Sequence, residues 1–134
     1  MLASRINNLI NNYPDFPKKG ILFKDITPIL SKPKIFSEVI DQMSSLTFYE
    51  KADALIAIDA RGFLIGSALA LKLNKPLVLA RKPGKLPGDI STKTYELEYG
   101  TNSLSIQNKL LDGPVQQIYL QNLEIHNQNR IQMA

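Results

Sequence analysis

The chain has 134 residues, 44% of them hydrophobic, which suits one domain with a core and excludes disorder of the whole chain. It has no cysteine and one histidine, so disulfides, a thiolate nucleophile, a cysteine-based zinc site and any site that needs two histidines are excluded. No signal peptide and no stretch of about 18 apolar residues is found, so we expect a cytoplasmic protein without membrane contact.

The first 31 residues predict a short amphipathic helix followed by an irregular segment. Apolar residues recur at helical spacing near the N-terminus, at Leu2, Ile6, Leu9 and Ile10. Residues 13–17 contain two prolines, which force extended or turn geometry and end the helix. The apolar run at residues 21–23 follows, and its Phe23 is interpreted either as core or as a stacking surface for an aromatic ligand.

A second helix is expected from about residue 33. Ser31 is its expected N-cap, and Pro33 would lie in the first helical turn. Apolar positions after it line one helical face, at Ile35, Phe36, Val39, Ile40 and Met43.

The clearest unit in the chain is a strand, a helix and a second strand. Residues 54–58 form a run of five apolar residues, as in strands that are buried on both faces. Residues 63–73 are rich in Ala and Leu at helical spacing, residues 74–76 end this helix, and residues 77–80 form the second apolar run. This order predicts a βαβ unit, and open α/β sheets bind ligands at the carboxyl ends of their strands.

Both expected strands end in a polar, basic turn. In the first turn, residues 59–62, Arg61 precedes Gly62, so that backbone amides and a guanidinium can hold an anion. The second turn, residues 81–85, carries three cations, Arg81, Lys82 and Lys85. The alternatives are an ordinary strand-to-helix turn with a solvated arginine, and a surface loop with solvated lysines.

The isoelectric point of about 9.3 and net charge of +4 suggest nucleic-acid binding, but the cations cluster on turns instead of spreading over a face. A local cluster of this kind suits a phosphorylated small molecule better than a duplex, so no nucleic-acid partner is expected. The residues alone predict an α/β domain that binds phosphate or pyrophosphate.

Residues 92–99 alternate polar and bulky side chains, which predicts an antiparallel strand or a hairpin. Glu96 and Glu98 would share one face, either facing solvent or with one acting as an acid–base catalyst under a closing lid. From Gln107 to the end, 10 of 28 residues are Asn or Gln. Residues 108–134 therefore form a divergent tail, for which a packed fold and disorder are both open.

Four motifs of this chain resemble adenine phosphoribosyltransferases, in the order and at the spacing of that family. They run from Tyr13-Pro14-x-Phe16-Pro17 to Phe23-Lys24-Asp25-Ile26-Thr27, then Asp59-Ala60-Arg61-Gly62-Phe63, Arg81-Lys82-Pro83-Gly84-Lys85-Leu86-Pro87 and Thr94-Tyr95-Glu96-Leu97-Glu98-Tyr99-Gly100-Thr101. Each motif alone is modest, but together they are specific, and they cover about residues 10–107.

The resemblance implies a fold and a reaction. The fold would be α/β, with the parallel sheet of type I phosphoribosyltransferases flanked by helices, over a domain of residues 1–107 in which residues 1–31 supply a helix and a small N-terminal hood. In the reaction, which belongs to purine salvage, adenine and phosphoribosyl pyrophosphate would give AMP and pyrophosphate. Mg²⁺ would be bound through the substrate diphosphate, with no metal ligands from protein side chains. Family members are typically homodimers.

The resemblance also implies roles for individual residues. Arg61 and Glu98 would be catalytic, with Glu98 as the acid–base group near N7 of adenine. Phe23 and Lys24 would lie in the hood over adenine, with Phe23 near the ring. The pyrophosphate would be bound by the cations of both turns and a tyrosine, namely Arg61, Arg81, Lys82, Lys85 and Tyr99.

The chain departs from the family after about residue 107. Family members continue with a buried strand, two adjacent acids that hold the ribose hydroxyls, and a Thr-Gly-Gly-Thr turn that holds the 5′-phosphate. This sequence has no adjacent pair of acidic residues and no Gly-Gly, so no phosphoribosyl loop is found, and we expect the later strands to be missing. A truncated or divergent, inactive chain is expected, or alternatively a non-catalytic fragment that binds nucleotide or pyrophosphate. A shifted reading frame across residues 118–124 is one origin that sequencing of the gene would test.

Overall fold

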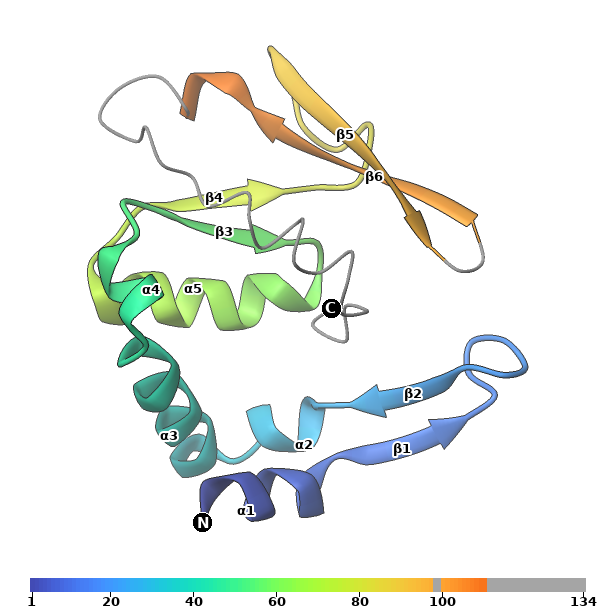
Figure 1. The fold of residues 1–134 in the computed structure, drawn as a ribbon, viewed down its shortest axis with the longest axis vertical. Coiled ribbons are helices and arrows are strands. Elements are labelled where there is room, and N and C mark those ends of the chain that lie inside the picture. The colour runs from blue at the N-terminus through green and yellow to red at the C-terminus, as the bar shows by residue number, and fades with distance from the viewer. Residues whose placement is uncertain (98–99, 111–134) are drawn as a thin grey trace. The chain divides into compact units, whose positions relative to one another are not determined.

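The computed structural model describes residues 1–97 and 100–110, which fall into two compact units, Met1–Ser45 and a second unit that begins at Leu46. These residues form a mixed α/β structure with three two-stranded sheets (Figure 1). A parallel strand pair is present, as expected, but the larger parallel sheet of the expected fold is not found among the described residues. Most of the divergent tail, and the question whether it folds, lies outside the described residues.

The first unit contains three helices and a β-hairpin. Its elements are α1 (Leu2–Leu9), β1 (Asn11–Pro14), β2 (Leu22–Asp25), α2 (Thr27–Leu30) and α3 (Pro33–Ser44). Leu2 of α1, Ile29 of α2 and Ile35 of α3 form a buried cluster, and Ile6 and Val39 pack against it. The expected apolar faces of α1 and α3 are thus confirmed, and their burial holds the helices of this unit together.

The start of α3 differs from the expectation. Ser31 is not its N-cap, because Lys32 takes that position without a side-chain capping bond. The Ser31 hydroxyl instead donates to the carbonyl oxygen of Pro28 at 2.9 Å, since Ser31 ends the helix α2. Helix α2 has four residues, too few to show helical periodicity in the sequence. Its C-cap residue, Ser31, is therefore easily taken for the N-cap of the next helix. Pro33 lies in the first turn of α3, as expected.

The second unit contains the predicted βαβ arrangement. Its elements are α4 (Thr47–Lys51), β3 (Leu55–Ile58), α5 (Arg61–Leu73), β4 (Leu77–Ala80), β5 (Ile90–Leu97), β6 (Gly100–Gln107) and the 3-10 helix η1 (Asn108–Leu110). Strands β3 and β4 pair in parallel, while β5 and β6 pair as an antiparallel hairpin, so both predictions are confirmed. Among the described residues, no helix is both long and apolar enough to cross a membrane.

Different elements cover the two faces of the β3–β4 pair. On one face, Val78 and Ala80 of β4 pack against Ile106 of β6. On the other face, Ala57, which is 2% exposed, meets Gly66 of α5. A Cβ built on Gly66 would lie 2.6 Å from the Cβ of Ala57, closer than real Cβ atoms approach. Helix α5 therefore lies against β3 at a separation that a larger residue at position 66 would disturb.

We expect Gly66→Ala to lower the free energy of unfolding by roughly 1–2 kcal/mol. Overpacking of a tight contact costs about 1–3 kcal/mol, and the better helix propensity of alanine offsets up to about 1 kcal/mol of that cost. Ser67→Ala is the matched control, because Ser67 is exposed and its hydroxyl bonds the carbonyl oxygen of Leu64 within α5. Urea denaturation followed by circular dichroism measures both variants. Equal stability of the two would contradict the close approach of α5 and β3.

Candidate functional site

The two basic turns begin side by side at one edge of the β3–β4 pair. Ile58, the last residue of β3, is the register partner of Ala80, the last residue of β4. The N–H of Asp59 donates to the carbonyl oxygen of Ala80 at 2.9 Å, which extends the pairing by one residue. The turns that start at Asp59 and Arg81 therefore share an edge, as expected from the sequence.

Asp59 joins the two turns through its carboxylate. Its Oδ2 atom lies 3.3 Å from Nε of Arg81 in a salt bridge, and it accepts the backbone N–H of Lys82 at 3.4 Å. The side chain of Asp59 is 6% exposed and that of Arg81 is 31% exposed. Because water has limited access to this pair, salt screens it less than a pair on the open surface. The first turn thus holds the beginning of the second turn in place.

Arg81 is also held by two other elements. Its guanidinium carbon lies 5.8 Å from the ring centre of Phe63 in α5, within the range of a cation–π contact. Its backbone N–H donates to the carbonyl oxygen of Ser105 at 2.9 Å, and its own carbonyl oxygen accepts the N–H of Ser105 at 2.8 Å. Ser105 is 1% exposed, and its hydroxyl pairs with that of Thr92 at 2.8 Å. Strand β6 therefore fixes the backbone of Arg81, while Asp59 and Phe63 position its side chain.

The surroundings of Asp59 stabilise its charged form. Burial alone would raise the pKa of this carboxyl. The hydrogen bond from the Lys82 backbone, the hydrogen bond and charge of Arg81, and the charge of Lys85 outweigh burial and hold the pKa below its usual value. Lys85 is thus close enough to the first turn to act on it electrostatically.

The lowered pKa of Asp59 predicts a pH dependence of stability. A carboxyl with a depressed folded-state pKa stabilises the fold above its unfolded pKa of about 3.9, and this contribution is lost as the pH falls through the folded pKa. We therefore expect Asp59→Asn to be less stable than the parent protein at pH 7, and the difference to shrink as the pH falls below about 4. Denaturant titrations at several pH values measure it. Asp53→Asn, at an exposed position just before β3, is the control with the same substitution away from the two turns. A constant difference between the Asp59→Asn variant and the parent would contradict the pairing.

The local backbone places the other cations of the two turns. Arg61 is the first residue of α5, which begins two residues earlier than predicted, and it is half-buried. The N-cap residue Ala60 makes no side-chain capping bond, and its carbonyl oxygen accepts the N–H of Phe63 at 3.1 Å. Lys82 and Lys85 are exposed on the second turn, where Gly84 adopts a φ of 80°.

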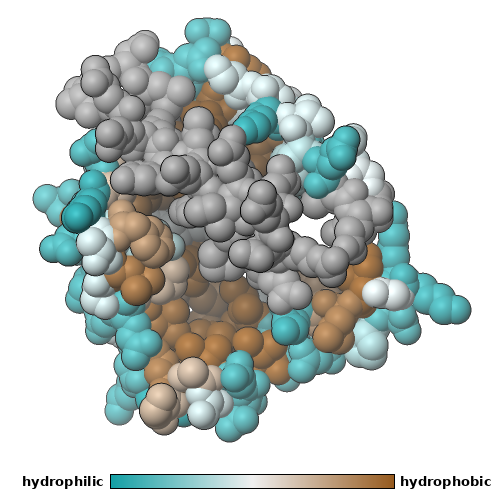
Figure 2. All heavy atoms as spheres, viewed as in Figure 1, coloured by the Kyte–Doolittle hydropathy of each residue, from teal (hydrophilic) through white to brown (hydrophobic). Residues whose placement is uncertain are grey.

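The expected adenine-binding residues lie in the first unit, on the β1–β2 hairpin. Phe23 of β2 pairs with Tyr13 of β1, and its half-buried ring meets that of Phe16 edge to face, with centroids 5.2 Å apart. Lys24 is exposed. Phe16 and Leu22 are 53% exposed each, and Figure 2 shows hydrophobic surface bordered by hydrophilic residues in the part of the view where this unit lies. The hairpin therefore offers an aromatic surface, in a different unit from Arg61 and Arg81.

Glu98 and Tyr99 lie outside the described residues, so their expected roles stay predictions. Glu96, two residues before Glu98, is exposed on β5. In the described ranges there is no group of three or more His, Asp or Glu side chains placed to hold a metal ion.

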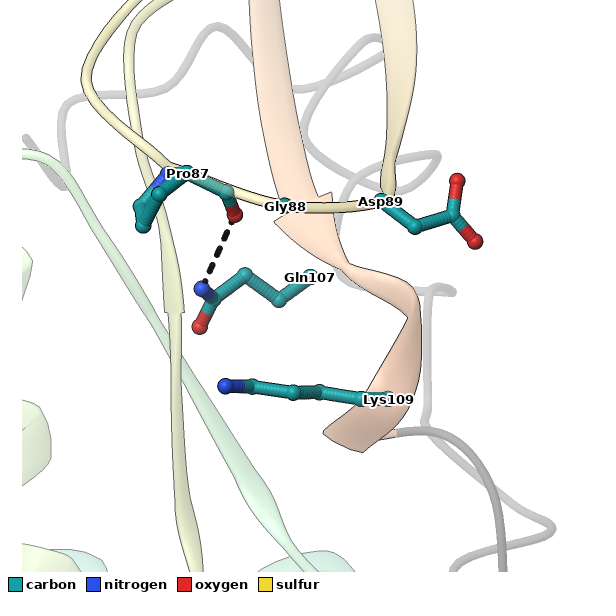
Figure 3. A pocket seen from close by; sticks show the side chains of 5 residues that line it. All are labelled: Pro87, Gly88, Asp89, Gln107 and Lys109. Carbon is teal, nitrogen blue, oxygen red and sulfur yellow. Dashed lines mark hydrogen bonds between the residues drawn. The ribbon is translucent and has the colours of Figure 1, made fainter.

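A pocket lies where β5 begins and β6 ends (Figure 3). It has a volume of about 340 Å³ and is lined by Pro87, Gly88, Asp89, Gln107 and Lys109. The Gln107 side chain donates from Nε2 to the carbonyl oxygen of Pro87 at 3.1 Å, and the Lys109 side chain extends beneath it. Among the expected site residues that the structure describes, none lines this pocket.

Sequence reasoning assigned no role to Asp59 or Ser105, although both shape the site. The signal for Asp59 was present, because it and Arg81 follow the last residues of two neighbouring strands. Opposite charges at equivalent strand ends indicate a contact between them. The signal for Ser105 was absent, because its pairing with Arg81 joins residues far apart in the sequence.

Comparison with known proteins finds adenine phosphoribosyltransferases that are similar to this chain. No protein-family model matches the chain. An adenine phosphoribosyltransferase of Prochlorococcus marinus is 56% identical over 112 residues, which make up 84% of this chain and 65% of that protein. The crystal structure of adenine phosphoribosyltransferase from Thermoanaerobacter pseudethanolicus matches with a TM-score of 0.74 and 48% identity, over 80% of this chain and 62% of the other.

A third relative carries ligands. The adenine phosphoribosyltransferase of Saccharomyces cerevisiae, crystallised with D-2,5-dideoxy-2,5-imino-altritol 1,6-bisphosphate and adenine, matches with a TM-score of 0.70 and 38% identity. The match covers 79% of this chain and 62% of the yeast protein. This chain therefore spans less than two thirds of the length of the relatives described.

Proposed function

Because this chain belongs to the adenine phosphoribosyltransferase family, we propose that its two basic turns together bind one diphosphate. This diphosphate is the leaving group when adenine and phosphoribosyl pyrophosphate give AMP and pyrophosphate, the reaction of purine salvage. The observation that carries the proposal is the 3.3 Å salt bridge between Asp59 and Arg81, because it ties the turn of Arg61 to the turn of Lys82 and Lys85. The cations of both turns are thus anchored at one edge of the β3–β4 pair.

The chemistry of the reaction explains the need for these cations. N9 of adenine displaces pyrophosphate at the anomeric carbon, through a transition state that resembles an oxocarbenium ion. Negative charge grows on the departing diphosphate, so cations that are already in position stabilise the transition state. Arg61 and Arg81 supply planar guanidinium groups that match phosphate oxygens, while Lys82 and Lys85 supply point charges. Tyr99 would bind the same diphosphate.

The β1–β2 hairpin would form the adenine side of the site. The Phe23 ring is held edge to face by Phe16, and this support presents a fixed aromatic surface for a purine. Lys24 and the backbone groups of β2 would read the edge of the base. Glu98 would act as the acid–base residue near N7 of adenine, on a loop that closes together with Tyr99. These assignments rest on the family motifs, since the hairpin and the basic turns lie in separate units.

Several properties of the family complete the proposal for this chain. Mg²⁺ would enter as part of the phosphoribosyl pyrophosphate substrate, bound to its diphosphate. The protein would act in the cytoplasm as a homodimer, with small molecules as its ligands and no nucleic-acid or membrane partner.

A second candidate function is binding without catalysis. It is favoured by the lack of adjacent acids and of a Gly-Gly turn in this sequence, which in the family hold the ribose and its 5′-phosphate. Such a chain would still bind pyrophosphate or a nucleotide through the two basic turns. Alternatively, it would pair with an intact subunit and contribute cations to that subunit's site.

Calorimetric titrations of the chain with pyrophosphate and with AMP test both candidates. We expect pyrophosphate to bind at one site per chain, with an affinity that weakens as salt is added, because the contacts are ionic. Phe23→Ala should weaken binding of AMP and leave binding of pyrophosphate unchanged, since Phe23 is assigned to the base. Lack of binding by the folded chain would contradict both candidates, and steep salt-dependent binding of DNA instead would favour a nucleic-acid function.

A further inference from the structure

We infer that Asp59 is a positioning residue of the diphosphate site, which orients the guanidinium of Arg81 so that its remaining N–H donors are presented to the ligand. The inference rests on the proposed function for the identity of the ligand. Its physical evidence is the arrangement of Asp59, Arg81 and Lys82, in which one carboxylate oxygen contacts a side chain and a backbone N–H of the second turn.

A carboxylate in an anion site needs an explanation. Its charge repels a diphosphate, so electrostatics alone would favour a neutral residue at position 59. Asp59 is also 6% exposed, and burial of a carboxylate is unfavourable unless the group is paired and hydrogen-bonded. Its partners are a side chain and a backbone group of the cationic turn itself. We therefore assign to Asp59 the function of holding that turn in a binding-competent arrangement.

Because the guanidinium group of arginine is planar, one hydrogen bond to it restricts the orientation of the whole group. A guanidinium carries its donors in a rigid planar fork, so a bond at Nε fixes the direction of the two terminal NH2 groups. Here Asp59 accepts from Nε, and the Phe63 ring lies near the guanidinium. The backbone of Arg81 is fixed by paired hydrogen bonds to Ser105. The side chain therefore loses little further freedom when the diphosphate binds, and such preorganisation raises affinity.

The contact with Lys82 extends the same effect along the second turn. The Asp59 carboxylate accepts the backbone N–H of Lys82. This hydrogen bond also fixes the position of the Lys82 backbone, from which the exposed residues up to Lys85 continue. The low pKa of Asp59 supports this arrangement, because it reflects these same contacts. One residue of the first turn thus aligns several cations of the second turn.

Asp59→Asn separates positioning from simple electrostatics, because the two predict opposite signs. The variant gains one unit of positive net charge, so electrostatics alone predicts tighter binding of pyrophosphate. Positioning predicts about tenfold weaker binding, since the amide forms a weaker contact with Arg81. Titration calorimetry at fixed ionic strength measures the sign, with Asp53→Asn as the control that adds the same charge at the other end of β3. Tighter or unchanged binding by a folded Asp59→Asn variant would overturn the inference.

A double-mutant cycle tests whether Asp59 acts through Arg81. In an Arg81→Ala background, Asp59→Asn should lower pyrophosphate affinity by clearly less than tenfold, and the remaining loss would act through the Lys82 backbone, whereas a residue that acts independently of Arg81 would give additive losses. A full additional tenfold loss would contradict the assigned role. Circular dichroism and thermal unfolding would verify that each variant remains folded.

The Nε–H resonance of Arg81 can be measured in the parent protein, without a ligand and without a variant that has to fold. In the free parent protein, we expect this proton to exchange with water at least about tenfold more slowly than that of Arg5, whose hydrogen bonds to Glu38 use its terminal NH2 groups. Equally fast exchange at both residues would show that Asp59 does not hold Arg81. If slow exchange is seen but pyrophosphate does not bind, the proposed function is wrong while the Asp59–Arg81 contact stands.

Discussion

Replacing Arg61 with alanine is expected to weaken pyrophosphate binding about tenfold to a hundredfold. A hydrogen bond to a charged group contributes about 1.5–3 kcal/mol, and each 1.4 kcal/mol corresponds to about tenfold in affinity. Arg61 lies at the start of α5 in the same turn as Asp59, whose carboxylate pairs with Arg81, and the proposed function assigns its charge to the diphosphate. Calorimetry with pyrophosphate measures the change directly.

The control for this variant is Arg5→Ala in the first unit. Arg5 pairs with Glu38 at 2.7 Å, and both side chains are nearly half exposed, so its removal changes net charge without touching the second unit's turns. Surface pairs of this kind contribute little, so stability should change by less than about 1 kcal/mol. If both arginine variants lowered pyrophosphate affinity equally, Arg61 would act only through the overall charge of the protein.

The second large effect is expected in catalysis. We expect the chain, supplied with adenine, phosphoribosyl pyrophosphate and Mg²⁺, to form AMP at least about a thousandfold more slowly than a full-length relative. Binding of non-reacting groups such as the 5′-phosphate aligns the reacting atoms, and loss of such alignment lowers the rate by large factors. The sequence offers neither the adjacent acids nor the Gly-Gly turn that perform this alignment in the family.

A direct assay of AMP formation measures this rate, with the Prochlorococcus marinus relative as the positive control. Turnover comparable to that of the relative would contradict the prediction and would show that other residues bind the 5′-phosphate. Binding of pyrophosphate without turnover would favour the non-catalytic candidate. The two outcomes therefore separate an enzyme from a binding protein of the same family.

The sequence predicted the elements whose residues repeat strongly and lie close together in the chain. Strands β3 and β4 and helix α5 were recognisable because apolar runs end at turn residues, and Asn74 ends α5 in the left-handed region with a φ of 52°. The adjacency of the two basic turns followed from parallel pairing, which the register of Ile58 and Ala80 confirms. Local pattern thus sufficed for the framework of the candidate site.

The contacts within the site were less predictable. The pairing of Arg81 with Ser105 depends on where the β5–β6 hairpin folds back, and no local pattern contains that information. The fit of Gly66 against Ala57 depends on the separation of a helix and a strand, which glycine permits but does not specify. The bond from Asp59 to Arg81 was predictable in principle, since strand register alone places the two residues together.

The most direct test follows the backbone amides of both turns by nuclear magnetic resonance while pyrophosphate is added. Joint binding of one diphosphate predicts that the amides of residues 59–63 and those of residues 81–85 other than Pro83 shift together, with one dissociation constant and one ligand per chain. Shifts in only one of these segments, or two different dissociation constants, would contradict it.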